Sequence, residues 1–337
     1  MVGPVKVGAV GVIVGGIGGG GDVGLAVVVV EDARLQGSVE AVASFARCSG
    51  RTVPNGLEQV AGALYRVLPG AVLGRRVFED KLVSTVWWAR EVFILCAEDP
   101  WGALVEGVEW LLQEYGAKCM IHADIGGDAL MTGYEAGLGS YTVDTVAKAV
   151  LASVSGMRGV RSIIAVGAAG GEGGGGEIGL DDLAATLSLL DSEEAILGAF
   201  APRRESLAPA WSLLGRAESG MLPLFLQAAE GARTARISMA YLHGKYEVKP
   251  WYRYVILIDA AKACKVSPLC MHATGRGVSG IRRWAGKRQE VDRRVARLYA
   301  RARSTLSRSG PGPLEEAIME ILERHARRGV RALDGCR

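Results

Sequence analysis

A glycine-rich stretch near the start of the chain, residues 15–24, is the feature that most restricts the fold. It reads Gly-Gly-Ile-Gly-Gly-Gly-Gly-Asp-Val-Gly and lies between two apolar runs, residues 7–14 and 25–30. This order predicts a strand, a tight loop and a helix. Glycines let the backbone turn sharply and approach a ligand closely, and the helix N-terminus adds partial positive charge. The loop is therefore expected to hold an anion, with phosphate as the favoured ligand.

The glycine loop also has a spacing and an acidic residue that bear on the ligand. The spacing Gly16-x-Gly18-x-x-Gly21 fits the GxGxxG pattern of dinucleotide-binding loops between a strand and a helix. No Gly-Lys-Ser/Thr follows, which excludes a Walker loop. Asp22 lies in the first helical turn, where a carboxylate is favourable for the helix dipole but repels a bare phosphate. It therefore either caps the helix or shares the site with phosphate, with a metal ion or a sugar hydroxyl between the two. The cofactor-binding candidates in this loop are Gly16, Gly18, Gly19, Gly20, Gly21 and Asp22.

A second acidic turn follows a predicted βαβ unit farther along the chain. A helix predicted over residues 101–115 separates two apolar runs, 92–97 and 119–125, and a right-handed parallel crossover is the default for such a unit. The second run ends in Asp124-Ile125-Gly126-Gly127-Asp128. Because ligands gather outside the carboxyl ends of parallel strands, we expect this turn and the glycine loop to face one site.

The residue types in these two turns predict magnesium chemistry. Carboxylate oxygens, completed by water and substrate phosphate, are the ligands that Mg²⁺ prefers. We therefore interpret Asp22, Asp124 and Asp128 as magnesium ligands, Asp124 and Asp128 also as candidate catalytic groups, and Gly126 and Gly127 as further cofactor contacts. Two alternatives stay open: the acids bind ribose hydroxyls, or they bond the backbone N–H groups of a tight turn.

Composition restricts the class of protein. With 337 residues, of which 49% are hydrophobic, the chain is long enough for one large α/β domain or two smaller ones. The longest uncharged stretch, residues 7–21, is interrupted by glycines and too short to span a bilayer, and no signal peptide opens the chain. These features predict a cytoplasmic protein without a membrane partner.

Six cysteines are spread along the chain without a CxxC motif, and several lie in apolar runs. They are therefore interpreted as buried thiols. Cys264, Cys270 and His272 are close enough in sequence to suggest a metal site, but their spacing fits no standard zinc pattern and a fourth ligand is not evident.

Charge is distributed unevenly. Residues 1–260 carry 21 basic and 29 acidic side chains, whereas residues 261–337 carry 18 and 7. We expect an α/β domain over residues 1–260 and a basic helical C-terminal extension over residues 261–337. The basic helices dock on the acidic body, form a solvated face, serve assembly of a homo-oligomer, or bind nucleic acid. Docking or a solvated face is favoured because no nucleic-acid-binding motif accompanies the charge.

Other segments carry weaker signals. Residues 57–67 are predicted to be helical. A second glycine-dense stretch, residues 167–179, is either a flexible linker or another loop at the ligand edge, with Glu177 as its candidate residue. His122, in the middle of a predicted strand, is either an acid/base or a packed core side chain.

Three of these motifs, taken in order, resemble a known family. They are the GIGGGGDVG stretch ending at Gly24, HADIGGDAL at residues 122–130, and GEIGLDDL at residues 176–183. Together they resemble archaeal and bacterial proteins grouped as domain-of-unknown-function family 1152, over roughly residues 7–260. The resemblance implies the α/β fold and the placement of the loops, and it implies no particular reaction.

The sequence therefore predicts a Rossmann-like, doubly wound, mainly parallel sheet with a C-terminal helical extension. The favoured function is binding and metal-assisted processing of a nucleotide or other phosphorylated metabolite. A first alternative is an NAD(P)- or flavin-dependent oxidoreductase, for which Asp32 and Glu40 bracket the expected distance of a ribose-binding acid. A second is a non-enzymatic nucleotide-sensing or nucleic-acid-associated module that uses the basic C-terminal helices.

Overall fold

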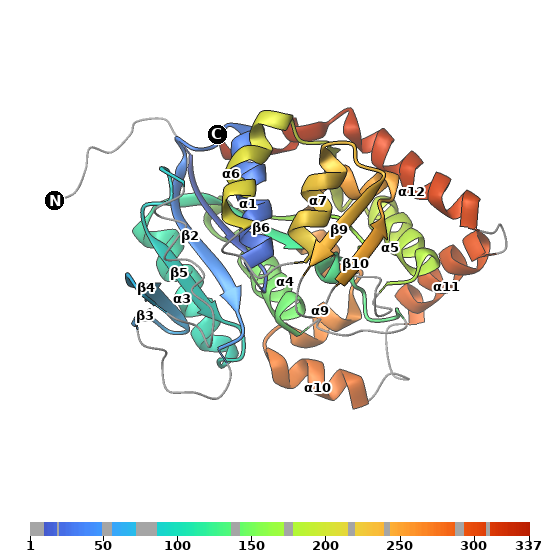
Figure 1. Ribbon diagram of the computed structural model, residues 1–337. Helices are drawn as coiled ribbons and strands as arrows, with labels where there is room; N and C mark the ends of the chain where they lie inside the picture. Colours follow the sequence, from blue (N-terminus) through green and yellow to red (C-terminus); the bar gives the residue numbers. More distant parts are fainter. Residues whose placement is uncertain are drawn as a thin grey trace.

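The computed structural model describes residues 10–18, 20–48, 56–71, 86–135, 142–171, 178–214, 220–238, 243–286, 293–307 and 311–337. The strands are β1 (Gly11–Gly16), β2 (Val39–Ala46), β3 (Leu57–Ala61), β4 (Leu64–Val67), β5 (Val92–Cys96), β6 (Ala117–Ile125), β7 (Arg161–Gly167), β8 (Ile196–Phe200), β9 (Thr234–Ser238), β10 (His243–Glu247) and β11 (Val255–Asp259) (Figure 1). The helices are α1 (Gly20–Ala33), α3 (Trp101–Glu114), α4 (Thr142–Val154), α5 (Leu180–Ser192), α6 (Arg204–Leu214), α7 (Met221–Ala229), α8 (Ala260–Lys265), α9 (Pro268–Ala273), α10 (Val278–Gly286), α11 (Arg293–Ser307) and α12 (Pro311–Ala326). Short 3-10 helices are η1 (Asp128–Leu130), η2 (Met157–Gly159), η3 (Pro250–Arg253) and η4 (Gly329–Cys336).

One 9-stranded sheet has the order β3-β4-β5-β2-β1-β6-β7-β11-β8. The strands from β5 to β7 are parallel, whereas β11 runs antiparallel between β7 and β8. From β1 the chain builds outwards through β2 to β5, and it then returns to add β6 on the other side of β1. The strand order therefore reverses between β1 and β6, which is where ligands bind in sheets of this kind. The predicted doubly wound, mainly parallel α/β fold is confirmed.

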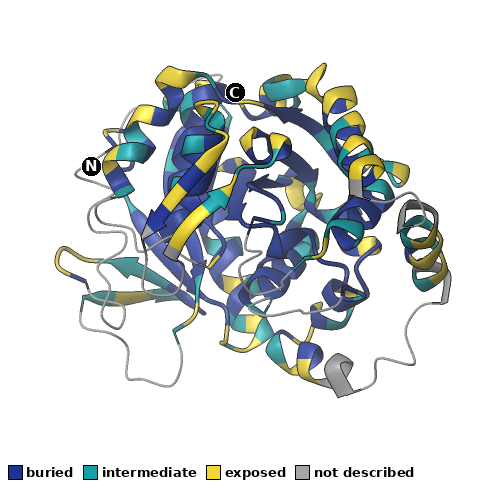
Figure 2. Cartoon of the chain, turned by 45° about the vertical axis from the view of Figure 1, so that its right-hand side comes forward, coloured by how far each residue is buried: buried dark blue, intermediate teal, exposed yellow. Residues whose placement is uncertain are grey.

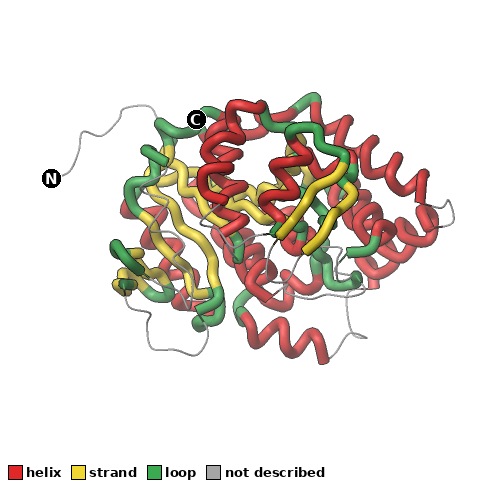
Figure 3. The backbone as a smooth tube through the Cα atoms, in the orientation of Figure 1, coloured by secondary structure: helices red, strands yellow, loops and turns green. Residues whose placement is uncertain are grey.

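The sheet forms the centre of the molecule because its parallel strands are apolar along their whole length. In β1, β5 and β7, nearly every residue is buried, as expected for strands covered on both faces. Helices α1, α6 and α7 cover one face, and α3 and α4 cover the other (Figures 1 and 3). Buried residues occupy the centre of the molecule (Figure 2). Helix α1 is buried around almost its whole circumference, which explains its run of valines.

The C-terminal part of the chain packs on the body. Helices α11 and α12 lie against α5, and η4 lies against β8 (Figure 1). The Arg303 guanidinium contacts the Asp181 carboxylate at 2.7 Å, and Arg324 contacts Asp191 at 2.6 Å. Part of the basic extension is thus docked through ion pairs, one of the arrangements expected from its charge. Nucleic-acid binding by its remaining arginines stays a prediction.

Two local expectations are wrong. Residues 57–67 form the antiparallel strands β3 and β4 rather than a helix, because the chain turns at Gly62, whose φ is +50°. The cysteines are not free thiols, since all six form disulfides: Cys48 with Cys96, Cys119 with Cys336, and Cys264 with Cys270. The last pairing also removes Cys264 and Cys270 from the metal site considered with His272. Among the helices that the structure describes, none has both the length and the hydropathy to cross a bilayer.

Candidate functional site

The candidate site lies at the carboxyl ends of β1 and β6, where the strand order reverses. The glycine loop leaves β1 after Gly16, and the second acidic turn leaves β6 after Ile125. The Ile125 N–H donates to Asp22 Oδ1 at 2.9 Å, so the carboxylate at the start of α1 binds the end of β6 directly. The two loops predicted to face one site therefore meet.

The backbone of the glycine loop is largely engaged by the sheet. The N–H of Gly16 donates to Ser44 Oγ at 3.1 Å. The next two amides, those of Ile17 and Gly18, donate to the carbonyls of Ala123 and Phe45, both at 2.8 Å. Any anion held by this loop must therefore bind farther on, at the first turn of α1, whose amides precede the intrahelical hydrogen bonds. Gly20 and Gly21 lie in that turn, and Gly19 is outside the described residues.

Close packing accounts for several of the glycines. A Cβ on Gly15 would lie 1.9 Å from the Ala43 carbonyl oxygen of the neighbouring strand. A Cβ on Gly16 would lie 2.8 Å from the Cβ of Asp22, so a glycine there lets α1 begin directly against β1. These contacts are shorter than non-bonded carbon atoms tolerate. Part of the sequence signal for a ligand loop is thus a requirement of strand and helix packing.

Glycine conformations and hydrogen bonds fix the turn after β6. Gly126 and Gly127 have φ values of +121° and +111°, which glycine adopts without strain. The Gly126 N–H donates to the Gly167 carbonyl at 3.0 Å, which ties the turn to the end of β7. Asp124 Oδ2 accepts from the Ala129 N–H at 2.9 Å, and Asp128 begins η1. The local N–H bond matches the tight-turn alternative for Asp124, and it occupies one of the two carboxylate oxygens.

Helix α4 adds two buried charged side chains that the sequence interpretation missed. Asp144 lies in its first turn and Lys148 one turn later, with exposed fractions of 6% and 1%. The Lys148 ammonium donates to the carbonyls of Ala129 at 3.0 Å and Met131 at 2.6 Å. The lysine therefore connects α4 to the same turn that carries Asp124.

The acidic side chains of the site perturb one another. Burial, and then the charge of Asp128, raise the pKa of Asp124 from 3.8 to about 7. Burial and the charges of Asp124, Asp128 and Asp22 raise the pKa of Asp144 well above its usual value. Burial lowers the pKa of Lys148 to about 8, although nearby carboxylates oppose that shift. With one lysine among four buried aspartates, the site favours the uptake of protons or cations.

The acidic residues of the site fit a magnesium ion in the chemical type of their donor atoms. Carboxylate oxygens are the right ligands for Mg²⁺. In the part of the chain that the structure describes, no three acidic, histidine or cysteine side chains are grouped closely enough to hold a metal. The magnesium roles of Asp22, Asp124 and Asp128, like the catalytic roles of the last two, stay predictions.

His122 belongs to the core rather than to the site. Its imidazole is fully buried and lies 5.3 Å from the Phe45 ring, measured between centroids. Nε2–H donates to the Ala43 carbonyl at 2.8 Å, whereas Nδ1 has no partner among the described residues. Burial lowers its pKa to about 4, so the ring is neutral at physiological pH. Of its two interpretations, the packed side chain fits this environment.

The residues considered for the alternative functions lie elsewhere. Asp32, near the end of α1, accepts hydrogen bonds from the Arg203 N–H and the Ser206 hydroxyl. Glu40 is the second residue of β2, at its amino end. Neither lies at the carboxyl end of β2, where a ribose-binding acid belongs. Glu177 is outside the described residues.

The strand order and the position of the acidic turns define an α/β protein of the Rossmann-like, doubly wound class. The chain belongs to the family of proteins of unknown function DUF1152, whose model matches residues 13–276. That match covers the sheet except for the first two residues of β1, and it includes the glycine loop and the second acidic turn, as the sequence motifs implied. Neither a curated protein nor a solved structure gives a significant match.

Proposed function

We propose that this protein binds a nucleotide or other phosphorylated metabolite at the carboxyl edge between β1 and β6 and processes it with the help of a magnesium ion. The observation that carries the proposal is the hydrogen bond from the Ile125 N–H to Asp22, which joins the two predicted ligand loops at the reversal of strand order. A crevice at this position is the usual ligand site of doubly wound sheets.

Each part of the site has a separate task in this proposal. The first turn of α1, which contains Gly20 and Gly21, faces the phosphate with its amides and its partial positive charge. Asp124 and Asp128, with Asp22, would supply carboxylate oxygens to hold a magnesium ion, and the ion would provide positive charge near a transferred or departing phosphate. The raised pKa of Asp124 also suits a group that accepts or returns a proton near neutral pH.

Charge makes the cation a necessary part of the proposal. The raised pKa values of Asp124 and Asp144 mean that negative charge is unfavourable at this site, and a bare phosphate would add more of it. Ligand binding should therefore depend on magnesium. The oxidoreductase alternative has less support, because Asp32 and Glu40 do not lie at the end of β2.

A thermal-shift screen tests the proposal. Nucleotides, dinucleotides and sugar phosphates are added with and without magnesium, because a ligand that binds only the folded protein stabilises it by about 2.7 kcal/mol at a hundredfold excess over Kd. We expect stabilisation by at least one phosphate compound only when magnesium is present. Asp124→Asn should abolish this effect, whereas Asp334→Asn, with a carboxylate that is 52% exposed and paired with Arg337, should preserve it. If no phosphate compound raises Tm, the proposal is wrong.

A further inference from the structure

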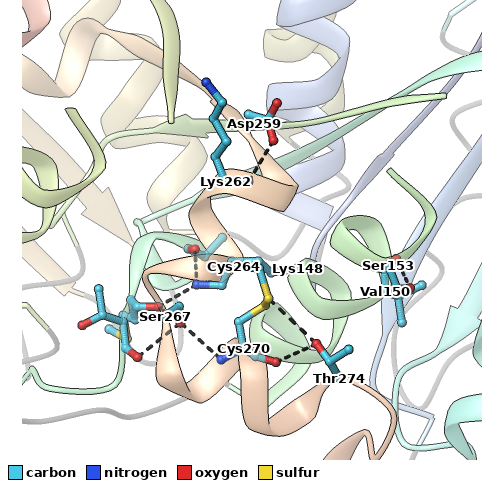
Figure 4. Close-up of a disulfide and its surroundings, with 12 residues drawn as sticks. Lys148, Val150, Ser153, Asp259, Lys262, Cys264, Ser267, Cys270 and Thr274 are labelled. Atoms are coloured by element: carbon cyan, nitrogen blue, oxygen red, sulfur yellow. Dashed lines mark hydrogen bonds between the residues drawn. A yellow bond between two sulfur atoms is a disulfide. The ribbon is translucent and has the colours of Figure 1, made fainter. Parts of the chain in front are cut away.

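The second acidic turn and the residues that follow it, 124–132, are together called the acidic turn below. A short segment at the start of the C-terminal extension contacts the end of this turn. This anchor segment, residues 264–270, connects α8 to α9 and is closed by the Cys264–Cys270 disulfide (Figure 4). Both of these short helices pack on α4, which contributes Asp144 and Lys148 to the site. The anchor segment therefore borders the candidate site, although none of the residues predicted for the phosphate and magnesium site lies in it.

Ser267, in the middle of the anchor segment, makes the contact to the acidic turn. Its side chain is 1% exposed, and its Oγ lies 3.0 Å from the Met131 carbonyl and 3.2 Å from the Thr132 carbonyl, to which it donates. The same oxygen accepts from the Cys270 N–H at 3.2 Å and so caps α9. The Leu269 N–H donates to the Thr132 carbonyl as well, at 3.2 Å.

Lys148 holds the same turn through two further hydrogen bonds. Its ammonium donates to the carbonyl of Met131, which Ser267 also contacts, and to that of Ala129. The Ala129 N–H in turn donates to Asp124 Oδ2. A continuous series of hydrogen bonds thus leads from Ser267 through the backbone of the turn to the Asp124 carboxylate (Figure 4 shows the part around Ser267 and Lys148).

The disulfide determines how freely Ser267 can move. Cys264 and Cys270 are 6 residues apart, and Ser267 is placed between them. Opening this small ring releases the connection between two short helices, each of which is too short to be stable alone. Both cysteines are buried, Cys264 at 7% exposed and Cys270 at 0%, so Cys264 is the less buried of the two and the first candidate for attack by an external thiol.

We propose that Ser267, held in place by the Cys264–Cys270 disulfide, is a positioning residue that fixes the acidic turn, so that the oxidation state of this cysteine pair regulates ligand affinity at the site. The regulatory consequence rests on the proposed function. The mechanical part, which is the ordering of the turn by the disulfide, does not.

The redox step is an ordinary thiol–disulfide exchange. A thiolate of a dithiol reductant attacks Cys264 Sγ, the S–S bond breaks, and Cys270 leaves as a thiolate that takes up a proton. The second thiol of the reductant then displaces Cys264, which also becomes a thiol. Two electrons pass from the reductant to the protein, and the reductant becomes a disulfide.

Hydrogen exchange of the turn amides, residues 129–133, tests the mechanical part without any ligand. In full-length Cys264→Ser/Cys270→Ser protein, we expect these amides to exchange about tenfold faster, which corresponds to the loss of about one net hydrogen bond. Ser267→Ala should have the same effect and Ser267→Thr a smaller one, because threonine keeps the hydroxyl. The matched control, Cys48→Ser/Cys96→Ser, removes a disulfide at the ends of β2 and β5 and should leave residues 129–133 unchanged.

An unchanged exchange rate in the Cys264→Ser/Cys270→Ser protein, or an equal increase in the control, overturns the proposal. If Cys264→Ser/Cys270→Ser protein does not fold, dithiothreitol is instead added to the folded control, Cys48→Ser/Cys96→Ser. Mass spectrometry then measures how far Cys264 and Cys270 are converted to thiols. Resistance of that pair to reduction while the protein remains folded also overturns it.

Affinity for magnesium with ADP, or with whichever phosphate probe stabilises the wild type, tests the regulatory part. We expect a Kd about tenfold weaker in Cys264→Ser/Cys270→Ser protein and unchanged in the control. Faster exchange with an unchanged Kd refutes regulation of the site. If no probe binds the wild type, the proposed function fails and regulation with it, while hydrogen exchange still decides whether the disulfide orders the turn.

Discussion

Asp124 is the site residue whose ionisation the fold changes in a directly measurable way. Burial and the charge of Asp128 raise its pKa from 3.8 to about 7. The unfolded chain therefore loses this proton near pH 4, whereas the folded protein keeps it until near pH 7. Because the folded state binds more protons within this window, the free energy of unfolding should fall as pH rises from about 4 to about 7.

The size of this effect follows from the pKa difference. A shift of about 3 units, at about 1.4 kcal/mol per unit, gives about 4 kcal/mol for Asp124. Asp124→Asn removes the titration and keeps an oxygen that can accept from the Ala129 N–H. Urea unfolding of wild type and variant near pH 4.5 and pH 7.5 measures the effect. We expect the loss of unfolding free energy between these pH values to be smaller by about 2–4 kcal/mol in the variant.

Asp334→Asn is the matched control, because the Asp334 carboxylate is about half exposed and lies far along the chain in η4. It should leave the pH dependence of unfolding unchanged. If Asp124→Asn retains the whole pH dependence of the wild type, Asp124 is ionised at neutral pH, and the electrostatic description of the site is wrong.

Three further predictions concern packing, charge and covalent structure. Gly24→Ala should lower the free energy of unfolding, measured with urea, by about 1–3 kcal/mol, because the alanine Cβ would lie 2.3 Å from Leu222 Cδ2. Unchanged stability would contradict the tight contact of α1 with α7. In the wild type, the depressed pKa of Lys148 should make the free energy of unfolding rise with pH between about 8 and 10.5. Lys148→Met should lack this rise, and it should also lose about 1–3 kcal/mol because the Ala129 carbonyl is left unpaired. A rise that persists in the variant would refute the assignment of this pH dependence to Lys148. Without reductant, Cys336→Ala should lower the free energy of unfolding by about 5 kcal/mol, because it removes the disulfide to Cys119. The difference from the wild type should vanish when both proteins are unfolded with urea in the presence of a reductant.

The two loops of the site could be predicted because the signals are local. An apolar run followed by glycines and an acid marks the carboxyl end of a strand, and parallel strands place such ends at one edge. The hydrogen bond from the Ile125 N–H to Asp22 confirms that the two loops lie at the same edge. Which glycines serve packing could not be predicted, because the short distances at Gly15 and Gly16 arise from neighbours placed by the fold.

Asp144 and Lys148 show where sequence reasoning ends. An acid and a lysine four residues apart on a helix are typical of an exposed ion pair. Here α8 and α9 cover that face of α4, and both side chains are buried. Likewise, residues 57–67 form a hairpin at the edge of the sheet, because β4 pairs with β5 and Gly62 approaches the Ala103 carbonyl. These outcomes depend on segments distant in sequence.

The disulfide between Cys119 and Cys336 has a consequence for how the molecule is made. It joins a central strand of the sheet to the penultimate residue and closes a covalent ring with a sequence separation of 217. Because a disulfide forms only after both of its cysteines have been synthesised, every strand and helix between Cys119 and Cys336 is made before this ring can close.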